Sequence, residues 1–454
     1  MMTTTWAFSL AIFFLGLGAL AGGRLQDRVG PRKVALAGVA LWGMGNILAG
    51  LGTPTFGAGW LYLTYGAMGG FGVGMGYVTP VAVVTKWFPD RRGLGSGLVV
   101  TGFGFGAVVC NLVVKSVPSF STAAAAAAEY AKAAQLGEFA ARVLPPEQMH
   151  AVLDMLTMSG IAFLLVGGLG AWFLVNPPAT SPPTGQVHPT AGQGSRSYTT
   201  REMLATRQFY LLWLMLFINV TAGILVISNA LPILQELTGA SPKVAAAAYG
   251  GVALFNALGR VFWGALSDRI GRRFAYSLIF TLQAGVFFVM GGAHSLFWAV
   301  TAYAVIMLCY GGGFGTMPSF NADYFGTKHM GANYGAILTA WGAAGVVGPL
   351  FVAEVKDLSG AFSGALPAVA TMLALATLLP LMALVPIGNR TRNGATLVGC
   401  GGRKHSIPNS RRSGIFDARR EVELSFADSV HCDPAHARRS KRLIESGTQL
   451  HVRK

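Results

Sequence analysis

Residues 256–273 read NALGRVFWGALSDRIGRR. The second half of this stretch is a dense basic turn, as expected of a short cytoplasmic loop in a membrane protein. The first half places Arg260 inside the apolar run 249–266, which otherwise has the composition of a membrane-spanning helix. A cation in such a helix costs about 2.5–3.5 kcal/mol even on lenient insertion scales, so it needs a water-filled cavity and usually an anion. The stretch therefore bears on both topology and ligand chemistry.

The composition is that of an α-helical membrane protein. Of 454 residues, 53% are hydrophobic and only 11% are charged, whereas a soluble domain carries about 25% charged residues. The 61 glycines suit helices that approach one another closely in lipid. Runs of about 20 predominantly apolar residues can each cross a bilayer as a helix. They predict eleven spans, near 6–23, 33–52, 59–83, 94–116, 153–175, 207–234, 245–266, 274–293, 296–320, 333–353 and 362–386.

The distribution of charge predicts the topology. A net charge of +16 would suggest a nucleic-acid partner, but half of that excess lies in the tail 388–454 and the other basic residues cluster in alternate loops. We therefore predict no nucleic-acid partner. The positive-inside rule predicts that these loops and the tail are cytoplasmic. We further predict a monomer embedded in the lipid bilayer of the inner (plasma) membrane. The loops carry Arg24, Arg28, Arg32 and Lys33; Lys86, Arg91 and Arg92; Arg196 and Arg201; Arg269, Arg272 and Arg273; and Lys328.

The sequence predicts no enzyme, cofactor or metal site. No nucleophile–base pair or phosphate-binding loop occurs, and the four cysteines show no paired spacing. The tail lacks periodicity and is predicted to be disordered, whereas the alanine-rich segment within 117–152 favours a short surface helix outside the membrane. Zinc-ligand residue types in the tail fit no compact zinc pattern: Cys400, His405, His431, Cys432 and His436.

The two halves of the chain repeat. GRLQDRVGPRK (23–33) aligns with GALSDRIGRRF (264–274), with one offset for the aspartates and the second glycines. WFPDRRGLGSGLVVTGFG (87–104) aligns with YFGTKHMGANYGAILTAWG (324–342) after one inserted residue. Two halves in one orientation, related by an axis along the membrane normal, indicate the all-α major facilitator architecture, with two pseudo-symmetric six-helix halves.

The repeat also predicts the domain organisation. We expect an N-terminal half at 1–175 (helices 2–6), a Pro/Gly/Ser-rich cytoplasmic linker at 176–206, a C-terminal half at 207–387 (helices 7–12) and the basic tail 388–454. Two spans precede Asp268, but only one precedes Asp27. The first half is therefore expected to lack its first helix, through truncation or a misplaced start; a natural eleven-span protein is the alternative.

These motifs resemble the oxalate:formate antiporter family of the major facilitator superfamily over roughly residues 1–386. GRLQDRVGPRK matches the superfamily's signature loop. The combination of KWFPDRRGLGSG, RQFYLLW, NALGRVFWGALSDRIGRR, SFNADYFG and GANYGAILTAWG is specific to the family. The resemblance implies a secondary transporter, with the anion-binding arginine at Arg260 and aromatic cavity positions at Tyr77, Tyr310 and Phe314. The oxalate transporter's second cation, a lysine, falls on Trp341 here, so this chain departs from the family at that position.

The charge count favours a substrate with one carboxylate. Arg is always protonated and its planar fork matches a carboxylate in bidentate fashion. The side chain of Arg260 points toward its helix N-terminus, away from the cytoplasmic end, which disfavours snorkelling as the alternative. A dianion would leave one charge uncompensated in a low dielectric. Trp341 therefore favours formate, lactate, pyruvate or a similar monocarboxylate, with ordinary packing as its alternative role; its repeat partner Phe103 is expected to face the same cavity.

The signature loops are predicted to act mechanically rather than to bind substrate. Their glycines allow tight turns, and their aspartates can pair with a helix N-terminus or an arginine across the bundle. Such contacts could break and re-form as the halves rock, although the loops could also serve only as topology determinants. The residues are Gly23, Asp27, Arg28, Gly30 and Arg32, and Gly264, Asp268, Arg269, Gly271 and Arg273.

We therefore predict a secondary transporter of small organic monocarboxylates that works by alternating access. The spans show no clear Asp, Glu or His, and proton-driven transporters usually carry one. This pattern favours anion exchange, or symport in which the substrate carboxylate takes up the proton. Two alternatives stay open: an efflux transporter of another substrate class, against which Arg260 counts, and an inactive truncated transporter.

Overall fold

The long apolar runs form helices that begin and end close to the predicted span boundaries. The computed structural model describes residues 2–118, 120–121, 146–178, 197–359 and 364–384. The helices are α1 (Met2–Val29), α2 (Pro31–Leu61), the π-helical η1 (Tyr62–Gly69), α3 (Gly70–Trp87), α4 (Arg92–Ser116), α6 (Pro146–Ala162), the π-helical η2 (Phe163–Gly167), α7 (Gly168–Trp172), α8 (Thr200–Leu204), α9 (Arg207–Thr238), α10 (Pro242–Ile270), α11 (Arg272–Met290), α12 (Leu296–Phe325), α13 (Met330–Ser359), α14 (Ala365–Ala376) and α15 (Leu378–Met382).

Among the described residues, nine helical segments are long and apolar enough to cross a membrane, and no strand occurs. One of them, Pro31–Trp87, is a continuous 57-residue run that contains two of the predicted spans. The loop expected between those spans is instead a sharp reversal at Gly57, whose φ of 71° costs little only for glycine. The two arms then pack against each other, as the hydrogen bond of 2.7 Å from Trp60 Nε1 to the Leu48 carbonyl shows.

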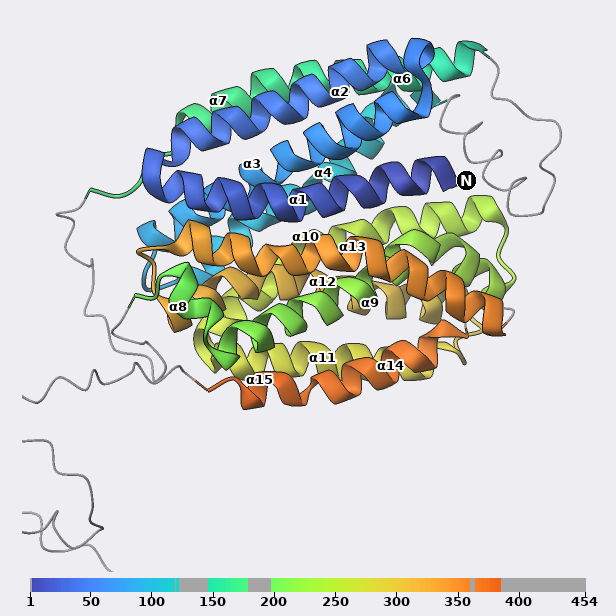
Figure 1. The fold of residues 1–454 in the computed structure, drawn as a ribbon. Helices are drawn as coiled ribbons and strands as arrows, with labels where there is room; N and C mark the ends of the chain where they lie inside the picture. Colours follow the sequence, from blue (N-terminus) through green and yellow to red (C-terminus); the bar gives the residue numbers. More distant parts are fainter. Residues whose placement is uncertain (1, 119, 122–145, 179–196, 360–363, 385–454) are drawn as a thin grey trace, which may run out of the picture. The chain divides into compact units, whose positions relative to one another are not determined.

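Helices from the two ends of the sequence form the two sides of the bundle. In Figure 1 the segments from α1 to α7 lie on one side and those from α8 to α15 on the other, with α1 against α13 and α4 against α10 between them. Glycines make these crossings close: a Cβ on Gly23 would overlap the carbonyl oxygen of Gly331, and one on Gly97 would overlap that of Arg260. Such contacts are typical of helices packed in lipid.

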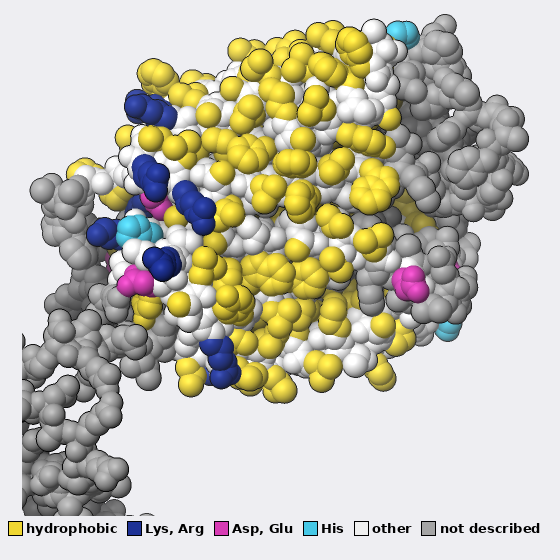
Figure 2. Space-filling model, viewed as in Figure 1, with side chains coloured by type: hydrophobic (Ala, Val, Ile, Leu, Met, Phe, Trp, Pro, Cys, Tyr) yellow, Lys and Arg dark blue, Asp and Glu magenta, His cyan; other side chains and the backbone are white. Residues whose placement is uncertain are grey.

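The surface matches a multi-pass membrane protein. Apolar side chains cover the middle of the face drawn in Figure 2, and Lys and Arg gather at one end of it. We call this the basic end; it holds the turns after α1 and α10, where Arg28 and Arg269 are exposed. This distribution agrees with the alternate basic loops of the sequence.

Some predicted segments lie outside the described residues: the tail 388–454, most of 117–152 and the middle of the linker 176–206. One short helix, in the part of the linker that the structure describes, was not predicted. Residues 197–206 of the linker contain α8, where Thr199 and Glu202 form a capping box. The sequence carries that signal as Thr-x-x-Glu, but the basic, Pro-rich surroundings masked it.

The close crossings predict a difference between two glycines of similar helices. A Cβ on Gly74 of α3 would overlap backbone atoms of Leu15, whereas one on Gly285 of α11 would meet nothing within 4 Å. Gly74→Ala should therefore lower the unfolding free energy by about 1–3 kcal/mol, the usual cost of overpacking. Gly285→Ala should be neutral or slightly stabilising, because alanine favours helix. Thermal unfolding of the purified protein in detergent measures both; equal shifts would contradict the packing described.

Candidate functional site

Arg260 is buried at the centre of the bundle without a carboxylate partner. It lies on α10 and is 2% exposed. Its Nε donates to Asn256 Oδ1 at 3.3 Å, one turn earlier on α10, and a terminal nitrogen donates to the Val100 carbonyl of α4 at 3.0 Å. Among the described residues no acidic side chain pairs with it. A guanidinium has five N–H donors. The two neutral acceptors satisfy only some of these donors, and they do not compensate the positive charge.

Two aromatic rings face the guanidinium, one from each side of the bundle, and two further rings pack against them. Arg260 Cζ lies 5.7 Å from the ring centre of Phe103 and 5.2 Å from that of Phe314. Trp341 touches three rings edge-on, with centroids at 5.3 Å for Tyr77, 5.4 Å for Phe103 and 4.6 Å for Phe314. Tyr77 and Phe103 are 5.5 Å apart. We call Tyr77, Phe103, Phe314 and Trp341 the aromatic cage; α3, α4, α12 and α13 supply one ring each.

Tyr310 stands one layer behind the cage. Its ring packs on Phe314 at 5.4 Å, and its other side lies against Gly223 of α9, where a Cβ would overlap the ring. Tyr310 thus packs behind Phe314. The structure brings together the five residues that the resemblance and the repeat place in the site: Arg260, Tyr77, Phe314 and Trp341, with Tyr310 against Phe314.

Tyr334 belongs to the site and was not predicted. It is fully buried on α13, and its hydroxyl interacts electrostatically with Tyr77 and Arg260. The hydroxyls of Tyr77 and Tyr334 have no partner at hydrogen-bonding geometry among the described residues. Buried polar groups are normally hydrogen-bonded, and these two hydroxyls interact with each other and with Arg260. The signal was the tyrosine of NYG, which the sequence argument used only as a landmark for Trp341.

At the basic end, each signature-loop aspartate caps a helix on the other side of the bundle. Asp268 accepts hydrogen bonds from the backbone N–H groups of Gly93 and Leu94 at the start of α4, at 2.9 and 2.8 Å. Asp27 accepts one from the N–H of Ala332 at the start of α13, at 2.9 Å, with Lys86 Nζ 3.6 Å away. A carboxylate is stabilised at a helix N-terminus, which is one of the two pairings expected for these residues.

Asp323 extends the Asp268 contact into a network that the sequence argument missed. Its two oxygens accept from Arg92 and Arg272, each at 2.8 Å, and Arg272 also pairs with Asp268 at 2.7 Å. Arg92 is on α4, whereas the other three residues are on or next to α10 and α12, so the network bridges the two sides. Arg272 had been assigned only a topology role.

The other loop residues have local roles. Gly30 and Gly271 turn the chain with φ of 91° and 87°. Arg32 lies over the Trp172 ring at 5.1 Å, and Arg273 donates to the carbonyl of Pro380 at 3.0 Å. Gly23 and Gly264 allow the close helix crossings. Arg28 and Arg269 are exposed.

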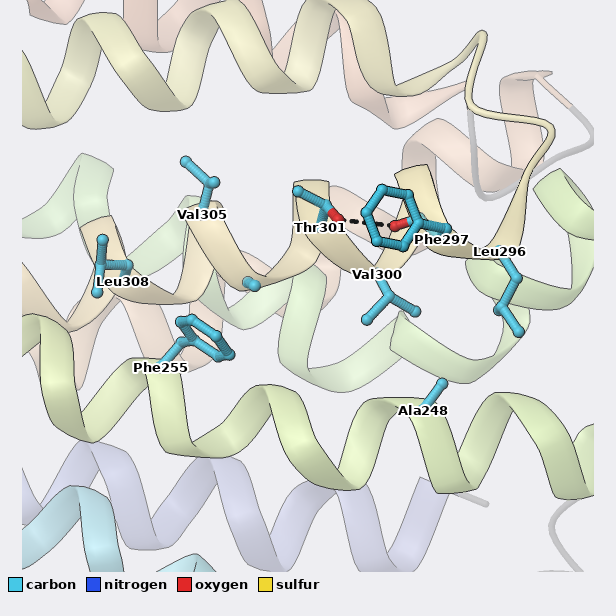
Figure 3. Close-up of a pocket in the computed structure, with 9 residues that line it drawn as sticks. Ala248, Phe255, Leu296, Phe297, Val300, Thr301, Val305 and Leu308 are labelled. Atoms are coloured by element: carbon cyan, nitrogen blue, oxygen red, sulfur yellow. Dashed lines mark hydrogen bonds between the residues drawn. The ribbon is translucent and has the colours of Figure 1, made fainter.

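The structure also has a cavity whose lining residues are separate from those of the Arg260 site and are almost all apolar. Figure 3 shows the pocket of about 560 Å³ between α10 and α12, lined by Phe255, Phe297 and other apolar side chains. Its one hydroxyl, on Thr301, already donates to the Phe297 carbonyl at 2.8 Å. The pocket therefore offers no group that could hold an anion. Within the described residues no group of three or more His, Cys, Asp or Glu is placed to bind a metal.

Comparisons with known proteins show which proteins this chain is similar to. The family model for the Major Facilitator Superfamily matches residues 2–349. The oxalate:formate antiporter of Oxalobacter formigenes is 28% identical over 346 residues, covering 75% of this chain and 73% of the antiporter. Apicoplast pyruvate carrier 1 of Toxoplasma gondii is 25% identical over 375 residues, covering 74% of this chain and 66% of the carrier. The E. coli fucose:proton symporter structure has a TM-score of 0.60 at 13% identity, covering 84% of this chain and 97% of the symporter; it shares the fold alone.

The aspartate caps predict how tightly the basic end is closed. Hydrogen bonds to a charged group are worth about 1.5–3 kcal/mol each, so Asp27→Asn combined with Asp268→Asn should loosen this end. Ser96, which donates to the carbonyl of Gly93 at the capped start of α4, is buried. In a chain whose four cysteines are replaced by serine, Ser96→Cys should react with a membrane-impermeant maleimide at least about tenfold faster when both aspartates are changed.

The control is Asp154→Asn on α6, an exposed carboxylate that should leave the labelling rate of Ser96→Cys unchanged. Labelling that does not respond to the paired aspartate substitutions would contradict a closing role for the caps.

Proposed function

Since the chain belongs to the Major Facilitator Superfamily, we propose that it carries small organic monocarboxylates across the membrane by alternating access of Arg260 to the two sides. The all-α major facilitator fold and the family resemblance predicted from the sequence are confirmed by the family match and by the fold of solved transporters. The chain is a transporter and not an enzyme. The substrate and the mechanism are the proposal.

The observation that carries the proposal is a buried cation whose protein partners are all neutral. Leaving a charge buried and unpaired costs several kcal/mol, and a carboxylate in the cage would remove most of that cost through charge-assisted, bidentate hydrogen bonds. Tyr77 and Tyr334 add two hydroxyl donors beside the guanidinium. Together they form a donor set of one positive charge and two neutral hydroxyls, which suits one carboxylate.

The cage explains why one carboxylate is favoured over two. Trp341 occupies the position where the resemblance implies a second cation, and it is in contact with Tyr77, Phe103 and Phe314. A second carboxylate would therefore face aromatic carbon, without a counter-charge in a low dielectric. A short alkyl or keto group would fit that wall. Formate, lactate and pyruvate are the substrates of this kind that we propose.

The relatives support the substrate class. One is described as an oxalate:formate antiporter and another as a pyruvate carrier, and formate and pyruvate are both monocarboxylates. The chain covers most of both relatives, but at 25–28% identity their substrates indicate a class and not a compound.

The transport cycle that we propose uses the two aspartate caps as the closure of the basic end. In this proposal the basic end and the tail 388–454 face the cytoplasm, as the positive-inside rule favours, and the transporter acts as a monomer in the inner (plasma) membrane. Opening requires that Asp27 leave α13 and that Asp268 leave α4, while Arg260 loses its bond to the Val100 carbonyl. A bound carboxylate would compensate Arg260 at that step. The cycle is anion exchange, or symport in which the substrate carries the proton.

Removing the proposed anchor should abolish uptake. In proteoliposomes, Arg260→Ala should lower the initial rate of formate, lactate or pyruvate counterflow by about 100-fold or more, because truncating one partner of a buried charge pair costs about 2–5 kcal/mol. Arg207→Ala, which changes an exposed arginine at the start of α9, should transport at nearly the parental rate. Equal rates for both variants would overturn the role of Arg260.

Adding a second cation should move the selectivity toward dicarboxylates. Trp341→Lys places an ammonium among the cage rings, where a close charge pair is worth about 1.5 kcal/mol or more. The ratio of oxalate to formate transport, or of their inhibition constants, should rise by about tenfold. Trp341→Met removes the ring without adding charge, so it distinguishes the effect of the added charge from the effect of the enlarged cavity. If Trp341→Lys and Trp341→Met change the ratio equally, the charge argument fails.

A further inference from the structure

The last residues of the linker are docked at the basic end, on the side of the bundle formed by α8 to α15. Figure 1 shows α8 beside the start of α13, and the two helices are in contact. Tyr198 is 6% exposed, and its ring packs edge-on against that of Phe325, at the end of α12, with centroids 5.8 Å apart. Met203 of α8 is fully buried. This end of the linker therefore belongs to the packed core.

The backbone of Tyr198 joins the end of α12 to the start of α13. Its N–H donates to the Phe325 carbonyl at 2.9 Å, and its carbonyl accepts from the side-chain amide nitrogen of Asn333 at 2.9 Å. The Oδ1 atom of the same amide accepts from the Thr200 hydroxyl at 3.0 Å. Asn333 is fully buried, so both ends of its amide depend on the linker for these bonds. We call Tyr198, Thr200 and Asn333 the linker latch.

The linker latch acts on the helical turn that the Asp27 cap holds. Asn333 directly follows Ala332, whose N–H donates to Asp27 of α1 at 2.9 Å. Gly331, one residue earlier, lies against α1 so closely that a Cβ there would overlap the carbonyl oxygen of Gly23. A hydrogen bond weakens steeply as its distance and angle depart from the preferred values. The position of this turn therefore determines whether the cap forms.

The beginning of the linker is held beside the same cap, from the other side of the bundle. Trp87 Nε1 donates to the carbonyl of Val175, the residue before the linker, at 2.8 Å. Trp87 directly follows Lys86, whose Nζ lies 3.6 Å from Asp27. Each described end of the linker is therefore held next to a residue that contacts Asp27.

We propose that the linker latch positions the first turn of α13 for the Asp27 cap, so that the linker controls closure of the basic end. The inference rests on the closing role proposed above for this cap. Asn333 is the positioning residue, because it receives both linker groups and adjoins the N–H that Asp27 accepts. When the latch opens, this turn can shift and the cap is lost. A change in the linker thereby alters access to Arg260 from the basic end.

The test measures how fast Ala332→Cys reacts with a maleimide in the full chain, with its four cysteines replaced by serine, purified in detergent. Ala332 is 8% exposed, and a cysteine there keeps the N–H donor. Thr200→Val removes only the hydroxyl of the latch and should raise the labelling rate by about fivefold, as expected for one neutral hydrogen bond. Thr200→Ser keeps the hydroxyl and should label at the parental rate.

Two controls distinguish the latch from a general loosening of the protein. Ser96→Cys, at the cap on α4, should not respond to Thr200→Val, because the backbone groups that Asp268 accepts there belong to α4 and not to the latch. In a chain that also carries Asp27→Ala, Ala332→Cys should already react fast and Thr200→Val should add nothing. Such non-additivity is expected of groups that act through one network.

The outcomes separate the latch from the closing role of the cap. If Thr200→Val leaves the labelling of Ala332→Cys unchanged while Asp27→Ala raises it, the latch alone is wrong. If Asp27→Ala does not raise it either, the closing role of the cap fails as well. An increase that is equal at both reporters, or that persists with Asp27→Ala, would overturn the latch in favour of a general loosening. None of these rates depends on the substrate.

Discussion

A buried guanidinium that pairs with no acidic side chain among the described residues is the constraint on which the arrangement around it depends. Arg260 contacts the other side of the bundle twice: its side chain donates to the Val100 carbonyl, and its backbone carbonyl lies against Gly97 of α4. Gly315 of α12 lies against the same carbonyl. Neutral acceptors and two aromatic faces lower the cost of burial, but none of them supplies negative charge. In the proposed function, a substrate anion supplies the negative charge that these neutral groups lack.

The contacts at the basic end show how the pseudo-symmetry is broken. Both signature aspartates cap a helix across the bundle, but Asp268 accepts two backbone hydrogen bonds and Asp27 accepts one. The repeat aligns Asp323 with Lys86, so an acid in one half replaces a base in the other. As a result the α4 cap is reinforced by Arg92 and Arg272, while the α13 cap has only a loose contact with Lys86. The polar contacts at the two caps are thus unequal, and among the described residues the cap on α13 has fewer of them than the cap on α4.

The sequence predicted the fold more completely than the site, for physical reasons. Spans are set by the length and polarity of single segments, and the repeat supplied their arrangement. Arg260 was found because a charge in an apolar run is rare, and Phe103 was expected to face the same cavity as Trp341 because the two are repeat partners. Tyr334 and Asp323 were missed because a tyrosine in an apolar run and an acid near a loop are common. Their roles depend on the packing of α13 against α3 and of α12 against α4, which the sequence does not show. The reversal at Gly57 was missed because it depends on one φ value and not on composition.

The aromatic cage joins two halves that support it differently, and this bears on where selectivity arises. Phe314 and Trp341 are backed by packed helices: Tyr310 and α9 lie behind Phe314, and Thr339, two residues before Trp341, accepts from Trp213 of α9. Tyr77 and Phe103 instead line a cavity of about 650 Å³ between α2, α3 and α4, and Phe103 is 45% exposed. A ring fixed by packing on several sides loses less entropy on contact with a ligand than one free to change rotamer. In the proposed site, Phe314 and Trp341 therefore form the more rigid wall, and Phe103 belongs to the side that can adapt to the alkyl or keto group of a substrate.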